Sequence, residues 1–194
     1  DSPATRDIWP VRFHATPTVR VGGDRLAVTL AVENPGTAHL AFTCALHAYL
    51  RVHDVADVAV AGLHGTRYRE SGAPGRLRRD DDDVVRVPDA LDRVYVDVPR
   101  ELILREPDRA LGIELDAFPD AVLWNPGATA AAALADVESG EERSMLCVEG
   151  GAVQRPVTLA PHERWHGTQT LVARECVAGM VDGAIDVSSP EESR

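Results

Sequence analysis

The strongest constraint on the fold is an alternation of apolar and polar residues across positions 42–52. With a period of two, one face of this segment is apolar and consists of Phe42, Cys44, Leu46, Leu50 and Val52. The opposite face carries Thr43, Ala45, His47, Tyr49 and Arg51. Such alternation is typical of a β-strand with one face in the core. The second face combines an imidazole, a phenol and a guanidinium, which makes His47 the first candidate functional residue.

Comparable short segments recur along most of the chain, with turn residues between them. Beyond residues 26–33, which alternate regularly, further strands are predicted at 11–21, 55–60, 91–98, 102–104, 111–113, 121–124, 145–149, 153–159 and 168–173. Residues 1–10 are predicted to be a loop, and residues 129–136 are the one predicted helix, with Thr129 as its N-cap. Many short strands and almost no helix predict an all-β sandwich or barrel.

Length and charge limit the classes of function. A chain of 194 residues with 44% hydrophobic residues suits one globular domain, predicted over residues 1–173 and followed by an acidic, disordered tail at 174–194. The net charge of −11 argues against nucleic acid or an anionic membrane as the main partner. A small molecule is the expected partner, and a local arginine cluster would still allow an anionic one.

The cysteines and the N-terminus indicate the compartment and the extent of the chain. Cys44, Cys147 and Cys176 are too few and too scattered for a disulfide framework or a CxxC metal site, so a reducing, cytoplasmic location is expected. There is no signal-peptide pattern and no apolar run of membrane length. Because the chain begins at Asp1 rather than Met, we expect it to be a fragment of a longer protein.

Two polar motifs have simple alternatives to a metal site. His162-Glu163-Arg164-Trp165-His166 has the HExxH spacing of zinc peptidases, which place both histidines on one helix face. The flanking residues alternate as strands, so a turn is favoured, and a zinc hydrolase on His162, Glu163 and His166 is kept as a remote alternative. The four aspartates at 80–83 are interpreted as a solvated loop beside arginines, because EF-hand spacing is absent.

Glu149 and Trp124 also gain a functional interpretation from their chemistry, and each candidate has a simple structural alternative. Glu149 shares a face with Met145 and Cys147, so its carboxylate is expected to be partly desolvated, which raises a pKa towards that of a useful general base. The alternative is an exposed strand-end glutamate before a Gly-Gly turn. Trp124 either packs in the core or lies against the apolar face of a sugar ring. For His47 the alternative is an ordinary core or surface histidine.

A set of short motifs then recurs in order between Trp9 and Ala173. They are VEN at 32–34, ALHAY at 45–49, GLHGTRY at 62–68, LDRVY at 91–95, WNP at 124–126, Asp136, MLCVE at 145–149 and VTLAPHERW at 157–165. This succession resembles the aldose 1-epimerase (galactose mutarotase-like) superfamily, and most of all its glucose-6-phosphate 1-epimerase (hexose-6-phosphate mutarotase) branch.

The resemblance implies an antiparallel β-supersandwich that binds a sugar or sugar phosphate in a cleft. It also implies a reaction in which a base removes the anomeric O1 proton and an acid protonates the ring oxygen, so that the ring opens and recloses as the other anomer. The matching motifs assign His47 as the acid and Glu149 as the base, and Asp92 as a residue that contacts sugar hydroxyls. Tyr49 and Trp124 are expected to line the same site, and no metal or organic cofactor is implied.

The chain also departs from that pattern, because no segment matches the H-G-x-x-R motif of the family's N-terminal part. It therefore resembles the C-terminal portion of a mutarotase, lacking N-terminal strands. Two functions follow: an isomerase of aldohexose anomers, and a non-catalytic carbohydrate-binding remnant. Strand edges left exposed by missing strands would favour self-association.

Overall fold

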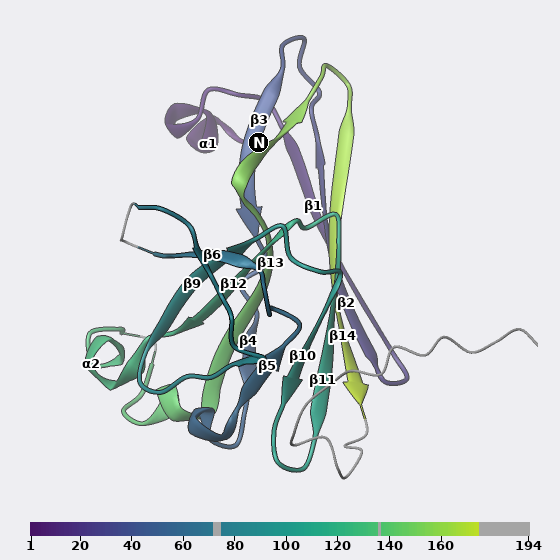
Figure 1. The fold of residues 1–194 in the computed structure, drawn as a ribbon. Coiled ribbons are helices and arrows are strands. Elements are labelled where there is room, and N and C mark those ends of the chain that lie inside the picture. The colour runs from purple at the N-terminus through teal and green to yellow at the C-terminus, as the bar shows by residue number, and fades with distance from the viewer. Residues whose placement is uncertain (72–74, 136, 175–194) are drawn as a thin grey trace, which may run out of the picture.

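The computed structural model describes residues 1–71, 75–135 and 137–174, and within them the strands form two facing seven-stranded sheets (Figure 1). The order of the first sheet is β1 (His14–Gly22), β2 (Arg25–Glu33), β14 (Arg164–Arg174), β11 (Ala110–Asp116), β10 (Glu101–Arg105), β5 (Ala59–Ala61) and β8 (Val84–Val85). The pairings are antiparallel.

The second sheet contains the segment of residues 42–52. Its order is β3 (Leu40–Ala45), β13 (Met145–Leu159), β12 (Asp120–Asn125), β9 (Leu91–Val96), β6 (Arg67–Glu70) and β7 (Arg78–Arg79), and β4 (Tyr49–Arg51) also pairs with β13. Helical structure in the described residues is limited to α1 (Pro3–Ile8), α2 (Gly127–Ala131) and the single 3₁₀ turns η1 (Val55–Asp57) and η2 (Glu141–Ser144). The predicted all-β, antiparallel fold class is confirmed.

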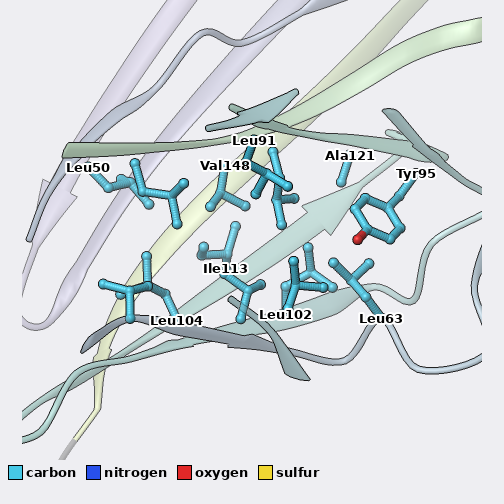
Figure 2. Close-up of a cluster of buried hydrophobic side chains, with 14 of the residues drawn as sticks. Leu50, Leu63, Leu91, Tyr95, Leu102, Leu104, Ile113, Ala121 and Val148 are labelled. Atoms are coloured by element: carbon cyan, nitrogen blue, oxygen red, sulfur yellow. The ribbon is translucent and has the colours of Figure 1, made fainter. Parts of the chain in front are cut away.

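The main core lies between the two sheets. Figure 2 shows Leu102, Leu104 and Ile113 of the first sheet facing Leu50, Leu91, Tyr95, Ala121 and Val148 of the second. All of these side chains are buried. Because burying one Leu or Ile side chain contributes roughly 1.5–3 kcal/mol, this layer holds the second sheet in place and leaves its other face for function.

The predictions for the N-terminal loop and for the one helix both differ from the structure. Residues 1–10, predicted to be a loop, contain α1, which begins with a capping box: Thr5 N donates to Ser2 Oγ at 3.2 Å, and Ser2 N donates to Thr5 Oγ1 at 2.7 Å. The sequence signal for this helix is Ser2, a preferred N-cap residue, followed by Pro3 at the first helical position. The other helix, α2, begins at Gly127 rather than Thr129, and Pro126 is its N-cap.

The interpretation of the aspartate run as a wholly solvated loop is wrong for its first member. Asp80 is buried, and its Oδ2 accepts a hydrogen bond of 2.6 Å from the Tyr95 hydroxyl. Arg93 Nη1 lies 3.3 Å from the same oxygen and its guanidinium stacks over Tyr68. A buried carboxylate needs such partners, so Asp80 ties the loop to the second sheet.

The first sheet ends in a long exposed edge. Every residue of β1 is exposed, including Val19 and Val21. Pro17, in the middle of β1, has no N–H to offer a further strand, which limits pairing along this edge. Self-association through strand edges stays a prediction. No helix among the described residues is long and apolar enough to span a membrane.

Candidate active site

His47 lies in a gap between two strands that pair with the same partner. β3 and β4 both pair with β13, and between them residues 46–48 leave the sheet, held by a hydrogen bond of 3.0 Å from Leu46 N to Gly150 O. The predicted alternation is confirmed: odd-numbered side chains from Thr43 to Tyr49 are exposed and the even-numbered ones are half-buried. His47 therefore projects on the outer face of the second sheet.

Glu149 lies opposite His47 and is buried. Its Oε1 is 3.3 Å from His47 Nδ1; the Glu149 side chain is 6% exposed, against 52% for His47. The alternative of an exposed glutamate at a strand end is wrong, because β13 continues through Gly150 and Gly151 to Leu159. A Cβ on Gly150 would come within 2.8 Å of Leu115, so this glycine serves close sheet packing rather than a turn.

Burial also sets the proton affinity of Glu149. Desolvation, with a smaller contribution from the negative charge of Asp92, raises the pKa of Glu149 from 4.5 to about 7. Both effects disfavour the carboxylate form. A carboxyl group with a pKa near neutrality can accept and return a proton, which is the property required of a general base.

Two aromatic side chains complete the wall beside His47. The Tyr49 ring stacks on the His47 ring, with centroids 4.7 Å apart and an interplanar angle of 11°. Trp124 meets both rings edge-on, at 5.8 Å from His47 and 6.2 Å from Tyr49. Flat aromatic surfaces beside a polar pair suit the apolar face of a pyranose ring.

Strand register aligns these side chains in one row. Tyr49 pairs with Cys147, Cys147 with Trp124, and Trp124 with Asp92 across β4, β13, β12 and β9. Directly paired residues point to the same face of a sheet. Glu149, two residues from Cys147, shares this face and contacts His47. The structure thus brings together all five residues predicted for the site, His47, Tyr49, Asp92, Trp124 and Glu149.

Cys147 lies in the site as well, although it was not among the predicted site residues. Its Sγ, a His47 ring nitrogen and a Glu149 oxygen lie within 4.8 Å of one another, which makes this the one group of three potential metal ligands among the described residues. Burial, with the charge of Glu149, raises the pKa of the Cys147 thiol to about 12. Because thiolate is the ligating form, a metal would first have to displace that proton. The sequence signal for its place in the site is its position two residues from Glu149, which puts both side chains on the same face of the strand.

The HExxH motif does not form a zinc-peptidase helix. His162 lies in the turn between β13 and β14 with a φ of 65°, and Glu163 Oε2 accepts a hydrogen bond of 2.8 Å from Ala160 N. His166 is part of strand β14. The two histidines therefore lack the shared helix face that the motif requires, and the zinc hydrolase hypothesis is wrong.

Replacing His162 with glycine is expected to be harmless. Glycine adopts the positive φ of this turn without strain, but it also has more freedom in the unfolded chain, and the two effects offset each other. The free energy of unfolding should therefore change by less than about 1 kcal/mol, which thermal melting of His162→Gly measures. A severe loss of stability would return the motif to consideration.

A direct titration of Glu149 should show the effect of its burial. Its ionised fraction should increase as pH rises through about 7, and the carboxylate infrared band or the side-chain carbon resonance in NMR measures that fraction. Asp92→Asn removes the nearby negative charge, lowers the pKa of Glu149 and should move this titration to lower pH. Asp116→Asn, at an exposed ion pair with Arg100, is the control and should not move it. A titration displaced to higher pH by Asp92→Asn would contradict the prediction.

Comparison with known proteins shows which family the chain resembles along most of its length. Residues 1–172 match the family model described as aldose 1-epimerase. A curated protein of Cenchrus ciliaris named "Putative glucose-6-phosphate 1-epimerase" is 33% identical over 179 residues, covering 88% of this chain and 54% of the relative. A Salmonella typhimurium protein of the same name is 29% identical, covering 91% and 58%. The chain thus spans somewhat more than half the length of these curated relatives.

Solved structures show the same fold. The crystal structure of a Salmonella typhimurium protein titled a "putative mutarotase" has a TM-score of 0.81 and 25% identity, covering 91% of this chain and 58% of that one. A structure from Escherichia coli K12, titled a "Putative aldose 1-epimerase", has a TM-score of 0.69 at 14% identity, covering 86% and 62%. The second likeness concerns the fold alone.

Proposed function

The chain belongs to the aldose 1-epimerase family, and we propose that it interconverts the α and β anomers of an aldohexose, specifically a hexose 6-phosphate, by acid/base opening of the ring. The observation that carries this proposal is the contact of 3.3 Å between His47 Nδ1 and Glu149 Oε1, in which one partner is buried with a pKa of about 7. Such a pair places an acid and a base side by side, where a single sugar can form hydrogen bonds with both.

In the proposed reaction, His47 and Glu149 exchange protons only with the sugar and return to their starting states. Ionised Glu149 takes the proton from the anomeric O1–H, while protonated His47 gives a proton to the ring oxygen. The bond from C1 to the ring oxygen breaks and an aldehyde forms at C1. Rotation about C1–C2 and reversal of both transfers yield the other anomer and restore the two residues. Because Nδ1 faces Glu149, the free Nε2 is the atom assigned to the ring oxygen.

The remaining residues of the site hold the sugar in this proposal. Trp124 and Tyr49 offer aromatic faces to the ring carbons. Asp92, half-buried two residues from Val94 on β9, accepts hydrogen bonds from ring hydroxyls. The names of the two curated relatives support glucose 6-phosphate as the substrate. The free thiols of Cys44 and Cys147 support a reducing, cytoplasmic location.

The second candidate function is sugar binding without turnover. The aromatic wall of Tyr49 and Trp124 would hold a sugar ring even without proton transfer. Exchange between glucose 6-phosphate anomers, measured by NMR magnetisation transfer, separates the two. Exchange faster than in buffer supports the isomerase; sugar binding with no acceleration would sink it in favour of the binding protein.

A further inference from the structure

Arg69 is a half-buried cation for which the structure shows no partner. Among the described residues, its side chain has neither an ion pair nor a hydrogen bond. Its neighbours differ: Arg67 pairs with Asp97 at 3.5 Å and Arg93 with Asp80 at 3.3 Å. A guanidinium without an internal partner remains able to bind an anion supplied by a ligand.

Strand register places Arg69 in line with the proposed base. Arg69 of β6 pairs with Val94 of β9, Val94 with Val122 of β12, and Val122 with Glu149 of β13. Directly paired residues point to the same face, so Arg69 and Glu149 are the two ends of one row on the outer face of the second sheet. The two valines form an apolar floor between them, and Trp124 lies beside it, two residues from Val122.

The length of this row matches a hexose 6-phosphate. Three inter-strand spacings of about 4.8 Å separate the Glu149 and Arg69 backbones by about 14 Å. With bonds of about 1.5 Å, a hexose 6-phosphate measures roughly 8 Å from O1 to phosphorus, and extended Glu and Arg side chains add roughly 3 and 6 Å. The anomeric oxygen can therefore meet Glu149 while the phosphate meets the Arg69 guanidinium.

A nearby cavity fits an anion less well. It measures about 500 Å³ and is lined in part by Arg67, Arg78 and Arg79. Each of these cations already has an acidic partner: Asp97 at 3.5 Å, Glu70 at 3.8 Å and Asp81 at 3.1 Å, respectively. A phosphate entering there would also meet those carboxylates.

We propose that Arg69 binds the phosphate of the substrate and makes the site selective for hexose 6-phosphates over free hexoses. This inference rests on the proposed function, since it takes Glu149 as the group at the anomeric oxygen. A guanidinium makes two parallel hydrogen bonds to a phosphate, which adds orientation to charge.

The test compares Arg69→Gln with Arg67→Gln, which removes the neighbouring cation of the same strand and face. Anomer exchange is measured by NMR with glucose 6-phosphate and with glucose. Arg69→Gln should lower the ratio of kcat/KM for the phosphorylated over the free sugar by about 10–100-fold, mainly through KM. Arg67→Gln should leave that ratio within about threefold, and Arg69→Lys should restore part of it. An unchanged ratio in Arg69→Gln would overturn the proposal.

A binding measurement tests the role of Arg69 independently of catalysis. Should the wild-type chain show no exchange, the proposed isomerase fails, and calorimetric titration with glucose 6-phosphate then tests Arg69. Weaker binding in Arg69→Gln than in Arg67→Gln supports the phosphate contact. Equal binding in both variants, or no binding by the wild type, overturns it.

Discussion

Replacing Glu149 with glutamine is expected to lower the rate of anomer exchange by about 10²–10⁴-fold, the usual contribution of a general acid or base. The amide has nearly the shape of the carboxyl group but cannot accept the O1 proton. The rate is measured by polarimetry or NMR exchange with glucose 6-phosphate, after subtraction of the uncatalysed rate. Full activity in this variant would remove Glu149 from its proposed role.

The same substitution should not destabilise the fold at alkaline pH. Folding raises the pKa of Glu149 from 4.5 to about 7, so the folded protein favours the protonated form. The resulting stabilisation is complete below about pH 4.5 and is lost as pH rises through about 7, at most about 3 kcal/mol. Glutamine carries no charge, so Glu149→Gln should melt at an equal or higher temperature than the wild type at pH 8, and the difference should shrink towards pH 5.

A matched control uses an exposed glutamate of the other sheet. Glu114, on β11, forms a surface ion pair with Arg25 at 3.1 Å. Because such pairs contribute about 0–1 kcal/mol, Glu114→Gln should alter neither exchange nor the pH dependence of melting by much. A Glu149→Gln protein that is unfolded at pH 8 would contradict the interpretation that burial of the charge is unfavourable.

Replacing His47 with asparagine is the second substitution with a large expected effect. Loss of the proton donor to the ring oxygen should lower exchange by about 10²–10⁴-fold, while sugar binding through the aromatic wall persists. His39→Asn, at an exposed histidine just before β3, is the control and should retain full activity. Both proteins are measured by the same NMR exchange assay and by calorimetric titration with the sugar.

The double variant tests whether the two residues act as a unit. His47 and Glu149 are in contact, and in the proposed reaction the removal of the O1 proton is coupled to protonation of the ring oxygen. Residues that act together are strongly non-additive. The variant with both substitutions should therefore be no more than a few-fold slower than the slower single variant. Fully multiplicative losses would indicate that the two groups serve separate steps.

Much of the fold could be predicted from local pattern, because strands and turns are specified by residues that lie close together in the sequence. The period of two in residues 42–52 correctly assigned each side chain to a face, and the turn residues located most strands. It failed where a tertiary contact overrides a local signal. Gly150 and Gly151 were interpreted as a turn, yet β13 continues through them because Leu115 of the opposite sheet packs against the bare backbone at Gly150.

Local sequence pattern identified which residues could carry chemistry: His47 stands on the polar face of its strand, and Glu149 shares a strand face with Cys147. The contact between them and the rise of the pKa of Glu149 to about 7 could not be read from local pattern, because both arise from the packing of distant strands. Desolvation depends on every element packed around the carboxyl group, and the charge of Asp92 acts through space from β9. The alternation that defined the first strand placed His47 on a face; the pairing of β3 and β4 with β13 made that face a candidate active site.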